Sequence, residues 1–236
     1  MFQVATLQSL ALGYTKSVIT VEELLEHGDI GLGTFEGVDG EMIILDGRCY
    51  QALADGSVFE AAPDKGVPFC VATHLQDKTV FDIGRTESID ELKALLDLTI
   101  DRRFELNSMH VVRIDGFFEK VQARSESGRQ SRHVELKSLL ENNQQDFSFD
   151  SISGTLVCVY FPDYMDGINA PGWHLHFVSD SRDRGGHVFD VCFDSAKAAI
   201  TKITTIEIRL PGEPEFDTYA LKGASNDDIK KVEQGK

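Results

Sequence analysis

In Gly172-Trp173-His174-Leu175-His176-Phe177, two histidines alternate with apolar residues, and a third follows eleven residues later in Gly185-Gly186-His187-Val188-Phe189. Successive side chains of a β-strand point to opposite faces, so His174 and His176 would share one face while their apolar neighbours pack on the other. The connection between the two stretches is polar, charged and ends in glycine, which indicates a hairpin turn. Folding at that turn brings His187 back beside His176.

Three imidazoles that converge from two paired strands leave coordination positions open, which is typical of a catalytic metal site rather than a closed structural one. Imidazole is also the commonest metal ligand among side chains. Two other interpretations stay open on the pattern alone. Histidines two residues apart also occur on half-buried strands, where backbone carbonyls satisfy the rings. Cupin barrels contain a His-x-His motif too, but a glutamate follows it a few residues on, where this chain has Asp180 in the expected turn.

Composition excludes several classes of protein. The chain has 236 residues, of which 42% are hydrophobic and 26% charged, so we expect a globular protein of one large domain or two closely joined subdomains. The formal net charge is −16, and such a surface repels phosphate backbones and anionic lipids. We therefore expect neither nucleic acid nor a membrane as a partner. An anionic small-molecule substrate would need a local positive centre, either a metal ion or an arginine.

The cysteines and the N-terminal residues favour a cytoplasmic location. The four cysteines, Cys49, Cys70, Cys158 and Cys192, lie far apart and form no Cys-x-x-Cys pair, which is typical of free thiols in a reducing compartment. The first twelve residues have neither a basic region nor a sustained apolar core, so they are not expected to act as a signal peptide. We also find no apolar stretch long enough to span a bilayer.

Local signals predict short helices and frequent turns in the first half of the chain. Thr20-Val21-Glu22-Glu23 and Ser88-Ile89-Asp90-Glu91 have the spacing of capping boxes, and each opens a run of apolar residues at helical spacing. The pairs Asp39-Gly40, Asp46-Gly47 and Asp55-Gly56 tolerate the positive φ of a tight hairpin turn. They predict a meander of short antiparallel strands.

The second half is predicted to be dominated by strands. We expect a hairpin over 107–123 with its turn at Asp115-Gly116, a loop over 125–132, a short helix over 134–140, a long strand or hairpin over 147–161, and a final helix that Asn226 caps. The predicted class is α+β, with predominantly antiparallel and mixed β-sheets and a few covering helices. The loop over 125–132 is the expected boundary between two closely joined subdomains, residues 1–124 and 125–236. The second of these would carry the three histidines.

Several segments, taken in order, resemble the bacterial alpha-acetolactate decarboxylase family. The resemblance runs from about Leu7 to Glu233. The segments that carry it are Glu22-Glu23-Leu24-Leu25-Glu26-His27-Gly28-Asp29, Gly31-Leu32-Gly33-Thr34-Phe35, Asp39-Gly40-Glu41, Ile114-Asp115-Gly116, Arg124, Gly154-Thr155-Leu156-Val157, Gly172-Trp173-His174-Leu175-His176-Phe177 and Gly186-His187-Val188. One such segment would mean little, whereas the whole set in this order is specific.

The resemblance implies a set of site residues and a dimer. It implies a zinc ion held by His174, His176 and His187, active-site roles for Glu41, Glu233 and Arg124, a substrate-binding position for Thr34 in the pocket, and a homodimer. Without the resemblance, Glu41, Arg124 and Glu233 would be expected at the solvent-exposed surface. One departure is visible, because the family often continues after the arginine with a Thr-Val-Pro-like stretch, whereas this chain has Ser125-Glu126-Ser127-Gly128.

The reaction that the resemblance implies is the decarboxylation of (S)-2-acetolactate to (R)-acetoin. Loss of carbon dioxide leaves two electrons on carbon, and a zinc ion that chelates the ketone and hydroxyl oxygens would stabilise the enediolate. Arg124 would hold the carboxylate, since its planar fork matches that group. We expect Glu41 to deliver the proton, with Glu233 as the alternative or as a partner. The competing hypothesis is a cupin-like metal protein that binds a small molecule without decarboxylating it.

Overall fold

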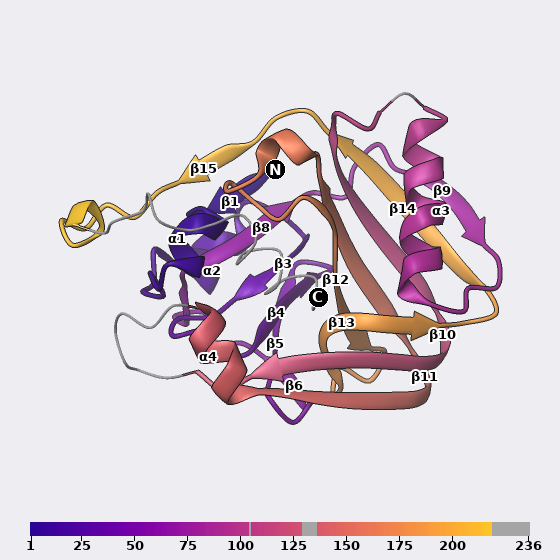
Figure 1. Cartoon of the computed structure of the whole chain (residues 1–236), viewed down its shortest axis with the longest axis horizontal. Helices are drawn as coiled ribbons and strands as arrows, with labels where there is room; N and C mark the ends of the chain where they lie inside the picture. The colour runs from indigo at the N-terminus through magenta and orange to yellow at the C-terminus, as the bar shows by residue number, and fades with distance from the viewer. Residues whose placement is uncertain (104, 129–135, 219–236) are drawn as a thin grey trace.

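The fold is built from two large β-sheets, as the computed structural model of the chain shows for residues 1–103, 105–128 and 136–218 (Figure 1). The first sheet has seven strands, in the order β15 (Glu207–Arg209), β1 (Phe2–Val4), β8 (Phe69–Thr73), β3 (Ile30–Thr34), β4 (Glu41–Leu45), β5 (Arg48–Ala52) and β6 (Val58–Glu60). The second has six, in the order β11 (Gln144–Phe161), β12 (Gly172–Ser179), β13 (Gly185–Cys192), β10 (Met109–Glu126), β14 (Ala196–Ile203) and β9 (Thr79–Ile83). A small third sheet pairs β2 (Ile19–Thr20) with β7 (Gly66–Val67).

In the part of the chain that the structure describes, the helices are few and lie around these sheets. They are α1 (Leu7–Ala11), α2 (Val21–Leu25), α3 (Ile89–Asp101) and α4 (Leu136–Asn143), with two 3₁₀ turns at Asp163–Met165 and Phe216–Thr218. The predicted α+β class, dominated by antiparallel and mixed sheets, is therefore confirmed. The neighbours in both large sheets pair antiparallel except β1 and β15, which pair parallel.

The expected meander forms the centre of the first sheet. Strands β3, β4 and β5 follow one another along the chain and pair as neighbours, with Thr34 opposite Glu41 and Glu41 opposite Ala52. The turn between β4 and β5 is Asp46-Gly47, whose φ angles of 54° and 73° are those of a two-residue hairpin turn. The sequence prediction of tight Asp-Gly turns is confirmed here.

The predicted hairpin over 107–123 is wrong, because β10 runs without a turn through Asp115-Gly116. Strands β10 and β11 are 18 residues each and pair from His110 opposite Tyr160 to Glu126 opposite Gln144. Gly116 does not have a positive φ; it pairs with Gly154 on one side and with Ala196 on the other. A Cβ atom at Gly116 would lie 3.0 Å from the Cβ atom of Ala196, so this glycine permits close strand approach instead of a turn. The expected hairpin or strand over 147–161 is likewise one long strand.

The two capping signals correspond to helices. Thr20 caps α2 with both hydrogen bonds of a capping box, and Ser88 caps α3 by accepting from the backbone N–H of Glu91. The buried stripe of α3 packs over the second sheet, and Figure 1 shows the helix lying along it. The predicted helix over 134–140 overlaps α4, which continues to Asn143, while residues 134 and 135 lie outside the described residues. The final helix expected after Asn226 lies outside the described residues.

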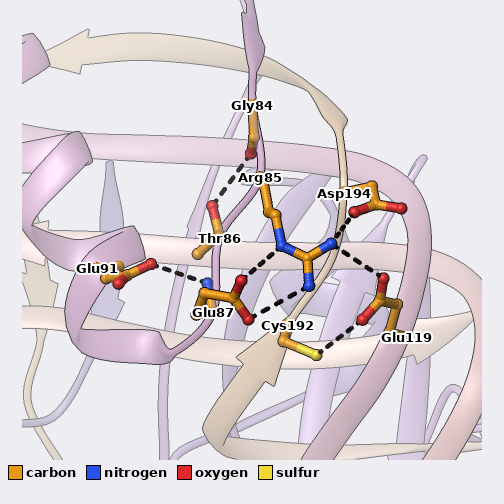
Figure 2. A network of polar contacts seen from close by, with 8 residues as sticks. All are labelled: Gly84, Arg85, Thr86, Glu87, Glu91, Glu119, Cys192 and Asp194. Atoms are coloured by element: carbon orange, nitrogen blue, oxygen red, sulfur yellow. Dashed lines mark hydrogen bonds and ion pairs between the residues drawn. The ribbon is translucent and has the colours of Figure 1, made fainter.

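A polar network joins the start of α3 to the second sheet (Figure 2). The Arg85 guanidinium pairs with Glu87, with Asp194 in the turn after β13, and at 3.6 Å with Glu119 in β10. The Glu119 carboxylate also lies 3.6 Å from the Cys192 thiol. The side chains of Arg85 and its three carboxylate partners are exposed, so these ion pairs contribute little to stability. Cys192 and the other three cysteines are free.

The two large sheets share a hydrophobic core. Leu32 and Ile43 of the first sheet lie in one buried cluster with Val157, Val159 and Val178 of the second. The expected subdomain boundary at residues 124 and 125 falls inside β10, and the division at that point stays a prediction. Among the described residues, no helix combines the length and the apolar character needed to cross a bilayer.

Candidate metal centre

The three histidines meet on one face of the β12–β13 hairpin. His176 and His187 are directly opposite in the register of the two strands, and His174 lies two residues before His176 on the same face. Trp173 and Leu175 alternate with them and are buried in the core that α3 covers. The hairpin and the return of His187 to His176, both predicted from the alternation and the polar turn, are confirmed.

The ring nitrogens are close enough to bind one ion. The Nε2 atom of His174 lies 3.0 Å from both the Nε2 atom of His176 and the Nδ1 atom of His187. The three groups offer ligand atoms that all lie within 4.8 Å of one another. Two nitrogens bound tetrahedrally to zinc at normal bond lengths stand about 3.3 Å apart, so the separations match a common ligand position.

The rings are held in the neutral form that a metal requires. Burial, together with the positive charge of Arg124, lowers the pKa of His174 to about 3. Burial also holds the pKa values of His176 and His187 well below the ordinary histidine value, with the neighbouring ring and Arg124 adding to the effect. At neutral pH all three imidazoles therefore carry a free lone pair.

A backbone contact orients His176. Its Nδ1 atom lies 2.8 Å from the carbonyl oxygen of Met42, in β4 of the first sheet. Because a carbonyl can only accept, Nδ1 carries the proton and Nε2 is left to face the other two rings. Outer hydrogen bonds of this kind fix the tautomer of metal-binding histidines, so the donor set fits a metal ion. The side chain of His176 is fully buried.

Glu41 and Arg124 lie beside the histidines. The Oε2 atom of Glu41 is 3.3 Å from Nε2 of His176, and its Oε1 atom is 3.9 Å from Nδ1 of His187. Arg124 is opposite His187 in the β10–β13 register, with its Nη2 atom 3.4 Å from Nε2 of that ring. The register shifts between Gln122 and Ala123, and such β-bulges are common next to active sites, where they re-aim side chains.

A pocket of about 450 Å³, counted to its open mouth, contains most of these groups. Its lining combines His174, His187, Glu41, Arg124, Glu126 and Gln144 with Gly33, Thr34 and the apolar residues Leu10, Val38, Phe69, Leu136 and Leu140. Thr34 is buried, and its hydroxyl donates to the carbonyl of Gly40 at 2.9 Å. The structure thus brings together every predicted site residue except Glu233, which lies outside the described residues.

Sequence reasoning missed Glu126. The expected loop over 125–132 would have left this residue in solvent, but Ser125 and Glu126 complete β10. Glu126 is 2% exposed and lines the pocket two residues after Arg124. Alternate residues of a strand share a face, so extending the strand by two residues would have placed Glu126 beside Arg124.

Comparison with known proteins gives the family. A family model described as alpha-acetolactate decarboxylase matches residues 1–223. The chain belongs to the alpha-acetolactate decarboxylase family. Two similar relatives, both called alpha-acetolactate decarboxylase, are 34% identical: that of Methanosarcina mazei over 99% of this chain and 80% of its own length, and that of Lactococcus lactis subsp. lactis over 94% of each.

Solved structures of the family have the same fold. The crystal structure of alpha-acetolactate decarboxylase from Bacillus subtilis strain 168 superposes with a TM-score of 0.92 and 30% identity, covering 98% of both chains. A Staphylococcus aureus protein described as similar to alpha-acetolactate decarboxylase superposes with a TM-score of 0.89. The resemblance found in the sequence and the enzyme class that it implies, an acetolactate decarboxylase, are confirmed. The convergence of Glu41 and Arg124 on the histidines also favours a decarboxylase over the cupin-like binder, which needs neither group.

Proposed function

We propose that this enzyme decarboxylates (S)-2-acetolactate to (R)-acetoin with a zinc ion held by His174, His176 and His187. The observation that carries the proposal is the convergence of three neutral imidazoles, a buried arginine and a carboxylate in one pocket. Three neutral ligands bring no negative charge to the site, which suits an electrophilic metal. When bound there, zinc supplies Lewis-acid stabilisation of the charge that develops on the ketone and hydroxyl oxygens as an enediolate forms.

Arg124 binds the substrate carboxylate in this proposal. The guanidinium is almost fully buried, so its interaction with an anion is weakly screened by water. It also supplies the local positive centre that a substrate anion needs on a chain of net charge −16. Its role is positioning, because a carboxylate held too firmly would stabilise the ground state.

Replacing Arg124 with lysine is expected to raise KM roughly tenfold and to lower kcat by a smaller factor. Lysine keeps the positive charge but cannot make the bidentate contact with the substrate carboxylate. Steady-state kinetics on acetolactate would measure both constants. Metal content must be measured on the same preparation, since Arg124 contacts His187. An unchanged KM in a fully metal-loaded variant contradicts the assignment.

Glu41 is the proposed proton donor. Its carboxyl oxygens face two of the three rings at 3.3 and 3.9 Å, so the group lies beside the ligand atoms that would hold the metal. Thr34 lines the same pocket, and Glu233 is proposed as a partner of Glu41 at the site. The homodimer and the cytoplasmic location stay predictions.

Metal removal tests the proposal directly. We expect untagged protein given racemic 2-acetolactate to form acetoin, to lose this activity on chelation and to regain it when zinc is added back. A colorimetric acetoin assay provides the rate, and chiral chromatography shows whether the product is (R)-acetoin. Full turnover by protein that elemental analysis shows to be free of metal contradicts the zinc assignment.

A further inference from the structure

A cluster of polar side chains surrounds the turn that precedes Glu41. Both peptide carbonyls of Asp39-Gly40 accept from side chains: that of Asp39 from Nε2 of Gln51 at 2.5 Å, and that of Gly40 from Oγ1 of Thr34 at 2.9 Å. Gly40 has a φ of +84°, and a Cβ atom there would lie 2.3 Å from the carbonyl oxygen of Ala52. The two peptide planes before Glu41 are therefore fixed, and with them the direction in which its side chain leaves the backbone.

The Asp39 carboxylate extends these contacts to a lysine. Its Oδ2 atom accepts from Nζ of Lys65 at 3.2 Å and from Nε2 of Gln51 at 3.0 Å, and Lys65 also donates to Oε1 of Gln51. Gln51 is fully buried, and Lys65 lies over the ring of Phe35 at 4.9 Å. Burial raises the pKa of Asp39, but the hydrogen bond and charge of Lys65, together with the hydrogen bonds from Gly128 and Gln51, outweigh this and hold that pKa below its ordinary value. The carboxylate is consequently ionised at neutral pH.

The same carboxylate reaches the segment that follows Arg124. Its Oδ1 atom accepts from the backbone N–H of Gly128 at 3.2 Å, and a Cβ atom at Gly128 would lie 2.5 Å from that of Asp39. A second contact runs in parallel, because the buried hydroxyl of Ser125 donates to the carbonyl of Ala52 at 2.8 Å. Ala52 is the residue paired with Glu41. Two links thus join the strand end that carries Arg124 to the hairpin that carries Glu41.

We propose that Asp39, Gln51 and Lys65, here called the Asp39 network, are positioning residues that fix Glu41 relative to Arg124 during catalysis. The inference rests on the proposed function, in which Arg124 binds the carboxylate and Glu41 protonates one face of the intermediate. Neither Asp39 nor Lys65 lines the pocket, so their effect on the reaction passes through the turn and through Gly128. A small displacement of the proton donor strongly lowers the rate of a step that depends on a near-attack geometry.

Asp39→Ala is expected to lower kcat about tenfold to a hundredfold while KM changes little. Arg124 would still bind the substrate carboxylate, whereas the side chain of Glu41 would no longer be held in one direction. The enantiomeric excess of the (R)-acetoin should also fall, since a loosely held acid, or water, then reaches both faces of the intermediate. Asp39→Asn keeps an oxygen for Gly128 and loses the charge that faces Lys65, so its kcat and enantiomeric excess should lie between those of the wild type and Asp39→Ala.

The matched control is Arg48→Met. Arg48 pairs with Glu60 at 3.1 Å between β5 and β6, in the same sheet, and both side chains are exposed. This variant should retain the wild-type kcat and enantiomeric excess. Should Asp39→Ala fold poorly, Asp39→Asn and Lys65→Met decide the question by the same two measurements.

The inference is overturned if folded, metal-loaded Asp39 variants match Arg48→Met in both kcat and enantiomeric excess. It is also overturned if only KM changes, because the network would then act on substrate binding. Failure of the proposed function is distinguished by two other results: a wild-type enzyme without metal-dependent acetoin formation, or a Glu41→Gln variant with full and stereospecific turnover.

Discussion

His176→Ala is expected to abolish metal binding and to lower the rate of acetoin formation by on the order of a thousandfold or more. This loss corresponds to the several kcal/mol by which a Lewis acid stabilises such a transition state. The substitution removes one of three ligand atoms and leaves the carbonyl of Met42 without its donor in a fully buried place. Elemental analysis of untagged protein measures the bound metal, and the acetoin assay measures the rate.

A loss of activity through unfolding has to be separated from a loss of metal. A ligand that binds only the folded state raises the melting temperature, so chelation should lower Tm for the wild type and leave that of His176→Ala unchanged. His74→Ala is the control, because this exposed histidine lies beside Asp29 and outside the pocket. Stoichiometric metal and normal turnover in His176→Ala would remove the three-histidine centre from the mechanism.

The three-histidine group is the part of this molecule that its sequence predicts best. His174, His176 and His187 lie within one hairpin, so the period of two and a polar turn suffice to bring them together. The short helices and the Asp-Gly turns of the first sheet are predicted for the same reason. Each depends on contacts between residues a few positions apart, such as the Thr20 cap of α2 and the Asp46-Gly47 turn.

Features that depend on distant contacts could not be found in the same way. The Asp115-Gly116 pair indicates a turn locally, but Asp115 is held in β10 by its pairing with Thr155 in β11 and with Lys197 in β14, and its carboxylate accepts from the hydroxyl of Thr155 at 2.7 Å. Such contacts outweigh the local preference of an Asp-Gly pair. The burial of Glu126 also depends on elements distant in the chain, because α1, β8 and α4 contribute to the same pocket.

Glu41 illustrates the limit most clearly. Next to an Asp-Gly turn, its local pattern predicts an exposed hairpin residue, and only the family resemblance marks it as part of the site. It reaches the histidines because β4 packs against β12, which places the carbonyl of Met42 against a ring 134 residues away in the sequence. Arg124 is similar, since its pairing with His187 requires the register of β10 against β13.

Glu41→Gln is expected to lower kcat by roughly a hundredfold to ten-thousandfold while metal content and KM stay close to those of the wild type. Glutamine has nearly the same shape as glutamate and can keep its place beside His176 and His187, but its amide has no acidic proton to deliver. Water would then protonate the intermediate from either face, so the acetoin that still forms should be close to racemic. Turnover rate and chiral chromatography provide the two measurements.

Three carboxylates compete for the role of acid, which makes the comparison among their glutamine variants decisive. Glu60→Gln, on the exposed edge strand β6, serves as the control for the substitution itself. Glu126→Gln tests the buried carboxyl beside Arg124, and Glu233→Gln tests the proposed partner. Because the donor alone sets which face is protonated, its variant should combine the lost rate with the lost stereospecificity. A racemic product from Glu126→Gln or Glu233→Gln, with (R)-acetoin from Glu41→Gln, would move the assignment to that residue and leave Glu41 a role in holding the histidines.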